Sequence, residues 1–324
     1  MKPVHLLPVV TLSFLASAAD PAPKTIVTTS IEEAGPDYQI QGEYAGTLGG
    51  QATGLQIIAL GNGTFKAVLF EGGLPGAGGV SASRREIDGA TKDGTTQFQN
   101  DSISISINDG KATTVISGTG ARHGTLVRTE RKSPTLGEKP PNGAIVLFNG
   151  SSADQFQGGR MTADGLLMEG TNSIKKFGSH RLHIEFMTPY MPSARGQGRG
   201  NSGVYYQGRY ETQVLDSFGL LGKNNETGGV YSIKDPSTNM CFPPLVWQTY
   251  DTEFTAAKYD SEGKKVKNAR LTTRLNGVVV QDDTELPNIT TAAPVKEGPE
   301  PGPLHLQNHG NPVRFRNIWI VETP

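Results

Sequence analysis

The sequence predicts an all-β protein built from two β segments that a polar linker joins. Three observations support this fold class. Apolar and polar residues alternate along many short stretches, as in Ser102–Ile107, where every second residue is Ile. Turn signals separate these stretches, in a chain of 324 residues with 41 Gly and 21 Pro. Helical periodicity of any length is hard to find, so we expect antiparallel strands and turns throughout.

Residues 1–19 have the layout of a secretory signal peptide. Lys2 precedes an apolar run from Leu6 to Leu15, and small residues follow up to a cleavage point after Ala18 or Ala19. The run is much shorter than the roughly 20 apolar residues that span a bilayer, which argues against a membrane anchor. We therefore expect a protein without a membrane span that is secreted or periplasmic.

Residues 20–130 are predicted to form a small N-terminal β domain. Leu55–Leu60 and Phe65–Phe70 flank Gly61-Asn62-Gly63, and Ser102–Ile107 and Ala112–Ile116 flank Asn108-Asp109-Gly110, so both pairs are expected to form hairpins. Residues 131–142 are polar and charged and contain three prolines, which is typical of an interdomain linker.

Residues 143–324 are predicted to form a second β domain, a sandwich or jelly roll. Arg181–Thr188 alternates between apolar and polar residues, and Asn276-Gly277 between two apolar runs is a strong signal for a two-residue hairpin. Long loops such as Gly219–Pro243 and Asp283–Pro303 join the expected strands.

Two strands of this second segment carry candidate site residues. In Gly302–Ile318, polar His305, Gln307, His309, Arg314 and Arg316 alternate with apolar residues, and Glu211 and Gln213 alternate with Tyr210, Thr212 and Val214. We expect Glu211, Gln213, His305, Gln307, His309 and Arg316 to converge on one sheet face, with Val214, Leu304, Leu306 and Phe315 buried between sheets. An exposed strand face with paired charges explains the spacing of Glu211 about equally well.

Composition excludes several function classes. The chain has 30 Lys and Arg against 31 Asp and Glu, scattered along its length, so no nucleic-acid partner is expected. A lone cysteine, Cys241, excludes an internal disulfide and is more typical of a buried small residue than of a nucleophile. The spacing of His305 and His309 does not suit a structural zinc site, and no Gly-x-Ser-x-Gly elbow is present.

Ordered motifs in the second segment resemble the 3-keto-disaccharide hydrolase family, formerly a domain of unknown function. They are Val146–Gly150, Asn201–Gly203, Tyr210–Asp216, Gly229–Tyr231, Trp247–Tyr250, Leu275–Gly277 and Leu304–Ile318, within about Asn142 to Glu322. The resemblance implies a concanavalin A-like jelly roll (the lectin/glucanase fold) in exported bacterial proteins of carbohydrate catabolism. Two positions depart from the family pattern: Phe156 stands where a Trp is usual, and Pro244–Val246 replaces a Pro-Gly-Glu turn.

The resemblance implies cleavage of 3-keto-glycosides or related disaccharides by proton abstraction, elimination and hydration. Such a site needs a base and donors for an enolate oxygen. We assign Glu211 or His309 as the base and Arg316, with Gln213, as the oxyanion holder; a divalent metal such as Ca²⁺ could replace Arg316. The remaining expected sugar contacts are Asn201, Asp216, Tyr231, Trp247, His305, Gln307 and Arg314.

Two other functions stay open from the sequence. The same planar polar groups could form a non-catalytic, lectin-like carbohydrate-binding surface. A conventional glycoside hydrolase would need a second carboxylate, Asp216 or Glu185, beside Glu211. Asp216 has the opposite strand parity to Glu211, so we rank this alternative third.

Overall fold

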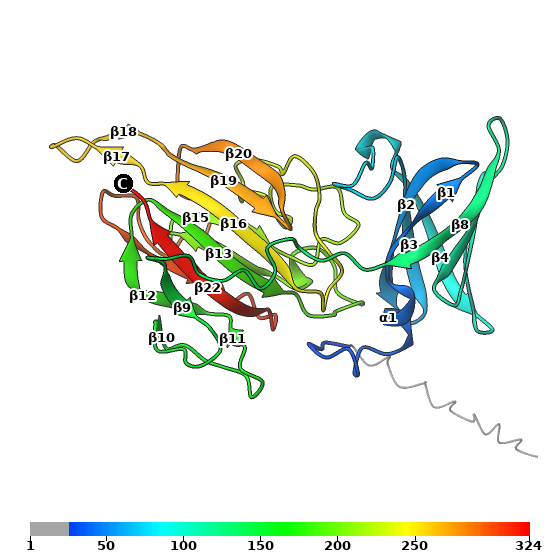
Figure 1. Ribbon diagram of the computed structural model, residues 1–324, viewed down its shortest axis with the longest axis horizontal. Coiled ribbons are helices and arrows are strands. Elements are labelled where there is room, and N and C mark those ends of the chain that lie inside the picture. The colour runs from blue at the N-terminus through cyan, green and yellow to red at the C-terminus, as the bar shows by residue number, and fades with distance from the viewer. Residues whose placement is uncertain (1–25) are drawn as a thin grey trace, which may run out of the picture.

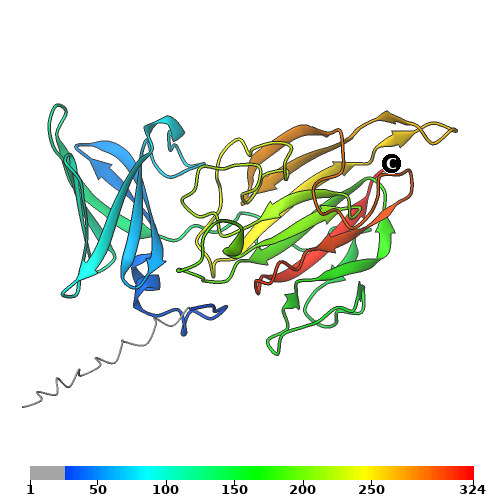
Figure 2. The same ribbon diagram turned by 180° about the vertical axis from the view of Figure 1, so that it is seen from behind.

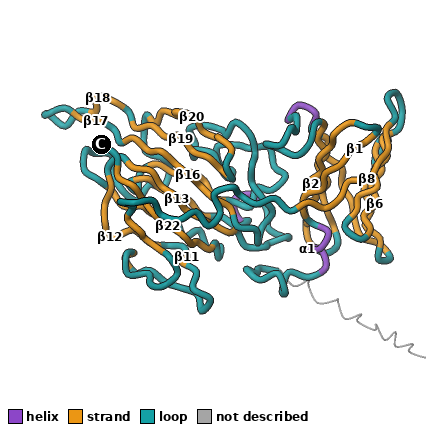
Figure 3. The backbone as a smooth tube through the Cα atoms, viewed as in Figure 1, coloured by secondary structure: helices purple, strands orange, loops and turns teal. Residues whose placement is uncertain are grey.

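The computed structural model describes residues 26–324, which form two β units side by side (Figure 1). The predicted signal peptide, residues 1–19, lies outside the described residues. A view from behind shows the same two units, and long loops fill the end of the larger unit that faces the smaller one (Figures 2 and 3). Among the described residues, no helix is long and apolar enough to cross a membrane.

The first unit is a closed barrel of eight antiparallel strands, preceded by a short helix. Each strand pairs with the next along the chain, and β1 closes the barrel against β8. The elements are α1 (Pro36–Ile40), β1 (Gly42–Leu48), β2 (Gln51–Gly61), β3 (Thr64–Glu71), a 3₁₀ turn (Ser81–Ser83), β4 (Arg85–Lys92), β5 (Thr95–Gln99), β6 (Ile103–Asn108), β7 (Lys111–Ile116) and β8 (Arg122–Thr129).

The barrel interior is filled by side chains. Every second residue of each strand points inward, and Tyr44, Leu55, Phe65 and Phe98 are at most 1% exposed. Both predicted hairpins are confirmed by the pairing of β2 with β3 and of β6 with β7. Since the interior positions hold packed apolar groups, the barrel is a solid core.

The second unit is a sandwich of two antiparallel sheets. A five-stranded sheet has the order β10 (Phe156–Gln157), β12 (Thr171–Phe177), β21 (Gly302–Leu306), β14 (Ser202–Tyr206) and β15 (Tyr210–Val214). A seven-stranded sheet has the order β11 (Leu167–Met168), β22 (Arg314–Glu322), β13 (His180–Met187), β16 (Gln248–Thr255), β19 (Ala269–Leu275) and β20 (Val278–Leu286), with β9 (Ile145–Phe148) also on β22. The short β17 (Lys258–Tyr259) and β18 (Lys265–Lys267) form a separate ribbon.

A single apolar core lies between the two sheets. Val214, Leu304, Leu306 and Phe315 belong to it and are at most 1% exposed, so their predicted burial is confirmed. The Asn276-Gly277 hairpin is also confirmed: both residues have positive φ, 52° and 82°, as a two-residue turn between β19 and β20 requires.

The chain changes sheet between β21 and β22. β21 pairs with β12 and β14 in the five-stranded sheet, whereas β22 pairs with β13 and β9 in the seven-stranded sheet. Alternate residues of the two strands face the shared core, so their polar residues point away from it in opposite directions. This crossing decides which predicted site residues can meet.

The barrel and the sandwich are in direct contact. Phe218, from a sandwich loop, packs with Ile58, Val68 and Phe70 on the outer side of β2 and β3. The buried guanidinium of Arg199 donates a hydrogen bond to the carbonyl oxygen of Ala59 at 3.1 Å. Apolar packing and buried hydrogen bonds therefore hold the two units together.

Residues 131–142, predicted to be a linker, lie across the outer face of the seven-stranded sheet. The hydroxyls of Ser133 and Thr249 are 2.6 Å apart, and the amide of Gly137 donates to Glu185 Oε1 at 2.6 Å. The carbonyl of Glu138 accepts a hydrogen bond from Asn317 Nδ2 at 2.9 Å. This segment is thus part of the sandwich's hydrogen-bonded structure.

Candidate functional site

A polar pocket of about 120 Å³ lies on the outer face of the five-stranded sheet. Its floor comes from β14 and β15, and its rim from loops before β14 and after β15, β20 and β21. The lining residues are Gln197, Asn201, Tyr205, Glu211, Gln213, Tyr231, Thr291, Ala292, Gln307 and His309. The structure thus brings together Glu211, Gln213, Gln307 and His309, as the alternation predicted, and adds the expected contacts Asn201 and Tyr231.

Strand parity explains why Glu211 and Gln213 face this pocket. Their neighbours Tyr210, Thr212 and Val214 are fully buried on the core side of β15. On β14, Tyr205 is paired with Glu211, and Gly203 is paired with Gln213. A Cβ atom at position 203 would lie 2.2 Å from Glu211 Oε1, so a glycine at this position leaves room for the carboxylate.

Glu211 is the buried carboxylate of the pocket, with an exposed fraction of 2%. The hydroxyl of Tyr205 donates a hydrogen bond to Glu211 Oε2 at 2.8 Å, and Gln307 Nε2 donates to that hydroxyl at 3.0 Å. None of the ten lining residues is Lys or Arg. Burial raises the pKa of Glu211 to about 8, although the Tyr205 hydrogen bond partly opposes this shift.

A network of amides forms the neighbouring part of the floor. Gln213 Nε2 donates to Asn201 Oδ1 at 3.0 Å and to Gln197 Oε1 at 3.2 Å. Asn201 Nδ2 in turn donates to the backbone oxygen of Gln197 at 2.8 Å. Gln213 Oε1 is buried and has no partner among the described residues. Since a buried acceptor without a partner is unfavourable, a ligand hydroxyl would complete this network.

The two predicted histidines differ in their surroundings. His309 is exposed and lines the pocket. His305 is not among the lining residues; its Nδ1 is 2.9 Å from Asn172 Oδ1, and its ring is edge-on to Tyr205 at 5.1 Å between centroids. Burial lowers the pKa of His305, so the ring is neutral near pH 7. His305 therefore supports Tyr205 rather than the ligand directly.

Arg316, Arg314 and Trp247 are not in this pocket, so the prediction that they join Glu211 is wrong. Arg316 lies on β22 of the other sheet, where its Nε donates to Glu185 Oε2 at 2.6 Å and its guanidinium stacks 4.0 Å from the Trp247 ring. Arg314 Nη1 donates to Glu169 Oε2 at 3.0 Å. The reason is the change of sheet between β21 and β22. Alternation of apolar and polar residues predicts which side of a strand faces the core, but it does not predict which sheet the strand joins.

Asp216 is also outside the pocket, contrary to its prediction as a sugar contact. Its side chain is 0% exposed, and its Oδ2 accepts a hydrogen bond from Arg199 Nε at 2.6 Å. β15 ends at Val214, and the chain then turns towards the barrel. Asp216 therefore stabilises the junction between the two units.

We expect Arg316→Ala to retain turnover within about threefold of the wild type, because Arg316 does not reach the pocket. The replacement removes the stacking on Trp247 and one hydrogen bond to Glu185, so the free energy of unfolding should fall by about 1–3 kcal/mol. Steady-state kinetics and urea unfolding measure the two effects. A hundredfold loss of turnover with unchanged stability would show that Arg316 takes part in catalysis after all.

Comparison with known proteins gives the family. The sequence pattern of the family described as "3-keto-alpha-glucoside-1,2-lyase-like domain" matches residues 143–321, more than half of the chain. The chain belongs to this family. The match covers the whole sandwich, from just before β9 to near the end of β22.

Two solved structures are similar to the lyase-like domain. One, from Parabacteroides distasonis ATCC 8503 and provisionally assigned as a glycosyl hydrolase, is 31% identical over 56% of this chain and 85% of that chain, with a TM-score of 0.51. A second, from the same organism and under the same assignment, is 20% identical over 56% of this chain and 94% of that chain, with a TM-score of 0.41. No curated protein matches the chain. The family and the first structure support a carbohydrate-active protein.

Sequence reasoning missed four pocket residues of the lyase-like domain. All five residues of β14 are buried, so apolar and polar residues do not alternate there. The sequence therefore did not indicate which face of the sheet Tyr205 points to. Gln197, Thr291 and Ala292 lie in long loops, where no period exists to place a side chain. Only the position of Tyr205 opposite Glu211 across a short hairpin could have been inferred from the sequence.

One group outside the pocket has the residue types of a metal site. Side-chain ligand atoms of Glu138, His183 and Asp251 lie within 4.8 Å of one another on the outer face of the seven-stranded sheet. Both ring nitrogens of His183 already have partners: Nδ1 is 2.6 Å from Asp251 Oδ1, and Nε2 is 3.3 Å from Asn317 Nδ2. A metal ion there would have to displace these hydrogen bonds.

Cys241 is fully buried, and burial raises the pKa of its thiol to about 12. The thiol is therefore protonated near pH 7 and is not a nucleophile. This agrees with the expectation that Cys241 is a structural residue.

Proposed function

We propose that the Glu211 pocket binds a 3-keto-glycoside and that the protein cleaves its glycosidic bond by elimination and hydration. A ketone at C3 of the sugar acidifies the proton at C2. A base removes this proton to give an enolate, the C1 substituent then leaves as an alcohol once it gains a proton, and water adds to the resulting double bond. The net reaction is cleavage of the glycoside by one water molecule.

The observation that carries the proposal is a single buried carboxylate among hydroxyl and amide groups. A conventional glycoside hydrolase needs two carboxylates about 5–9.5 Å apart, one on each side of the bond that breaks. Glu211 is the one Asp or Glu among the ten lining residues, while Glu185 belongs to the other sheet and Asp216 is paired with Arg199. An elimination route needs one base, and the pocket offers one.

Five of the ten lining residues have a role in this proposal. Ionised Glu211 takes the C2 proton, and Tyr205 holds its carboxylate in place. The free oxygen of Gln213 accepts a hydrogen bond from a sugar hydroxyl and so orients the ring. Tyr231 offers a neutral donor for the enolate oxygen, and exposed His309 stands where a leaving alcohol would take its proton.

Two further points belong to the same proposal. The sandwich would be a jelly roll of the concanavalin A-like type, which carries carbohydrate sites on an outer sheet face. Residues 1–19 would direct export, so that the reaction takes place outside the cytoplasm.

The decisive experiment offers the purified protein 3-keto disaccharides and the matching unmodified disaccharides and follows monosaccharide release. We expect release from the 3-keto sugars alone. Release from the unmodified sugars alone would overturn the elimination route. Saturable binding of a 3-keto sugar without release would show a lectin-like protein instead.

The pH profile tests the role of Glu211. The base form exists above the pKa, so kcat/KM should rise about tenfold per pH unit below pH 8 and level off above it. Tyr205→Phe removes the hydrogen bond that lowers this pKa, and its profile should therefore shift to higher pH. A profile that levels off near pH 5, or one that Tyr205→Phe leaves in place, would exclude Glu211 as the base.

A further inference from the structure

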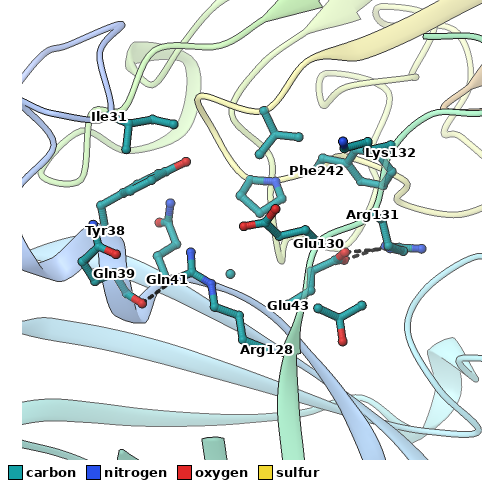
Figure 4. A pocket seen from close by; sticks show the side chains of 14 residues that line it. Ile31, Tyr38, Gln39, Gln41, Glu43, Arg128, Glu130, Arg131, Lys132 and Phe242 are labelled. Atoms are coloured by element: carbon teal, nitrogen blue, oxygen red, sulfur yellow. Dashed lines mark hydrogen bonds and ion pairs between the residues drawn. The ribbon is translucent and has the colours of Figure 1, made fainter. Parts of the chain in front are cut away.

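A second cavity, of about 230 Å³, lies where the barrel meets the sandwich. It shares no lining residue with the Glu211 pocket. Figure 4 shows its lining: α1, the start of β1 and the end of β8 contribute the barrel side, and the loop before β16 contributes the sandwich side. A molecule in this cavity would touch both units at once.

The facing walls of the cavity are apolar. Tyr38 and Ile31 stand on the barrel side, and Phe242, Pro243 and Val246 stand on the sandwich side. The Tyr38 hydroxyl donates to the carbonyl of Pro244 at 3.3 Å, which ties one wall to the other. The guanidinium of Arg131, which also lines the cavity, lies over the Phe242 ring, 5.0 Å from its centroid, and helps to hold that ring in place. The walls are therefore preformed in the structure as it stands.

Gln41 supplies an unpaired polar group to this cavity. Its exposed fraction is 1%, and its Oε1 accepts a hydrogen bond from the Ala59 amide at 3.0 Å, which fixes the orientation of its side-chain amide. Its Nε2 is buried and has no partner among the described residues. In Figure 4 this nitrogen points towards the space beside Tyr38. A buried donor without an acceptor is unfavourable, so an acceptor atom of a ligand would stabilise it.

The buried charge of the cavity is already balanced. Glu43, whose side chain is 2% exposed, accepts two hydrogen bonds from Arg131, both of 2.6 Å. The other ionisable groups of the lining are Arg128, Glu130 and Lys132, which carry both signs; Glu130 and Lys132 are exposed, and Arg128 is half-buried. A buried net charge on the ligand would have no counter-charge, and so a neutral molecule fits best.

We propose that this junction cavity is a binding site for a neutral monocyclic aromatic molecule that carries one hydrogen-bond acceptor beside its ring. An apolar cavity of about 150 Å³ is known to hold benzene, and the junction cavity is larger by the space of a small substituent. The ring would pack between Tyr38 and Phe242, and the acceptor would take the free Gln41 hydrogen. Because the ligand contacts both units, binding would also stabilise their association.

Acetophenone is a suitable probe, because it is neutral and its carbonyl oxygen is an acceptor beside the ring. Ligand-observed NMR titration should give a Kd of roughly 0.1–1 mM for a molecule of this size. Thermal unfolding should shift upwards at saturating probe. The absence of saturable binding in this range would overturn the proposal.

Three variants locate the binding. Val246→Trp fills the cavity from the sandwich side and should weaken binding at least tenfold, whereas Val266→Trp, on the exposed ribbon strand β18, should leave the Kd unchanged. Gln41→Leu keeps a similar side-chain size but removes the free donor together with the acceptor of the Ala59 amide, so its fold is checked by thermal unfolding; it should weaken binding about five- to tenfold. If Val246→Trp does not fold, Val246→Phe replaces it, with a smaller expected effect. If Val246→Trp and Gln41→Leu both bind acetophenone with wild-type affinity, the probe binds elsewhere.

Discussion

Glu211→Gln is expected to remove turnover of a 3-keto-glycoside almost completely while leaving binding largely intact. Gln has the shape of Glu but cannot take a proton near neutral pH. Removing a positioned general base costs about 10²–10⁴ in rate, so kcat should fall by that factor while Kd for the substrate changes little. Single-turnover kinetics and a binding titration separate the two quantities.

Glu211→Gln should also raise the free energy of unfolding in a pH-dependent way, whereas a variant that fails to fold would lower it. The pKa of Glu211 in the folded protein is about 8, above its ordinary value of 4.5, so the folded state holds a proton that the unfolded state releases. Wild-type stability therefore falls as pH rises from 4.5 to 8, and a neutral Gln removes that loss. We expect Glu211→Gln to gain free energy of unfolding, relative to the wild type, between pH 6 and pH 9.

His309→Ala is the matched comparison, because His309 lines the same pocket but is exposed. We expect it to lower kcat about tenfold to a hundredfold by removing a proton donor to the leaving group. A loss as deep as that of Glu211→Gln, with the fold intact, would give the base role to His309. Near wild-type turnover in both variants would place the chemistry outside this pocket.

Arg199→Met is expected to give the largest loss of stability of any single replacement discussed for this protein. It leaves the carboxylate of Asp216, with a side chain 0% exposed, without its partner at 2.6 Å. Breaking a buried ion pair from one side costs about 3–5 kcal/mol, because an uncompensated charge stays buried. The variant also removes the hydrogen bond to Ala59 of the barrel. Urea unfolding measures the change in free energy.

The double variant Arg199→Met/Asp216→Leu separates charge burial from packing. With both charges replaced by apolar groups of similar size, most of the lost stability should return. Additive losses in the double variant would mean that the two residues act independently. Turnover of the double variant should stay within about tenfold of the wild type, although Arg199 lies two residues before Asn201 of the pocket.

Much of the fold was predictable because strands and hairpins leave short-range signals. The alternation in β15 and β21 gave the correct outward face for Glu211, Gln213 and Gln307, and the correct core face for Val214, Leu304 and Leu306. Hydrophobic burial forces this alternation in any strand that covers a core. The part of the pocket floor that β15 contributes could therefore be predicted from the sequence, whereas Tyr205 of β14 could not.

Other parts of the site depend on information that alternation does not contain. Arg316 alternates with apolar residues in its strand just as His305 does, yet the chain changes sheet between them. Asp216 follows the end of β15, where the strand period stops and the contact with the barrel begins. Gln197 and Thr291 come from loops. Which sheet a strand joins, and where a loop folds back, are decided by long-range packing.

The contacts of residues 131–142 also decide where a truncated chain that contains only the sandwich should begin. The family match begins at residue 143, but Gly137, before that point, donates to Glu185, whose exposed fraction is 1%. Burial opposes ionisation of Glu185, yet hydrogen bonds from His183, Asn317, Arg316 and the Gly137 amide outweigh it and lower its pKa to about 2. A truncated chain starting at residue 143 would lose one of these donors, and it would also lose the Glu138 carbonyl that accepts a hydrogen bond from Trp319 Nε1 at 3.4 Å. We therefore expect a chain that starts at residue 131 to be more stable than one that starts at residue 143, although both contain the whole family match.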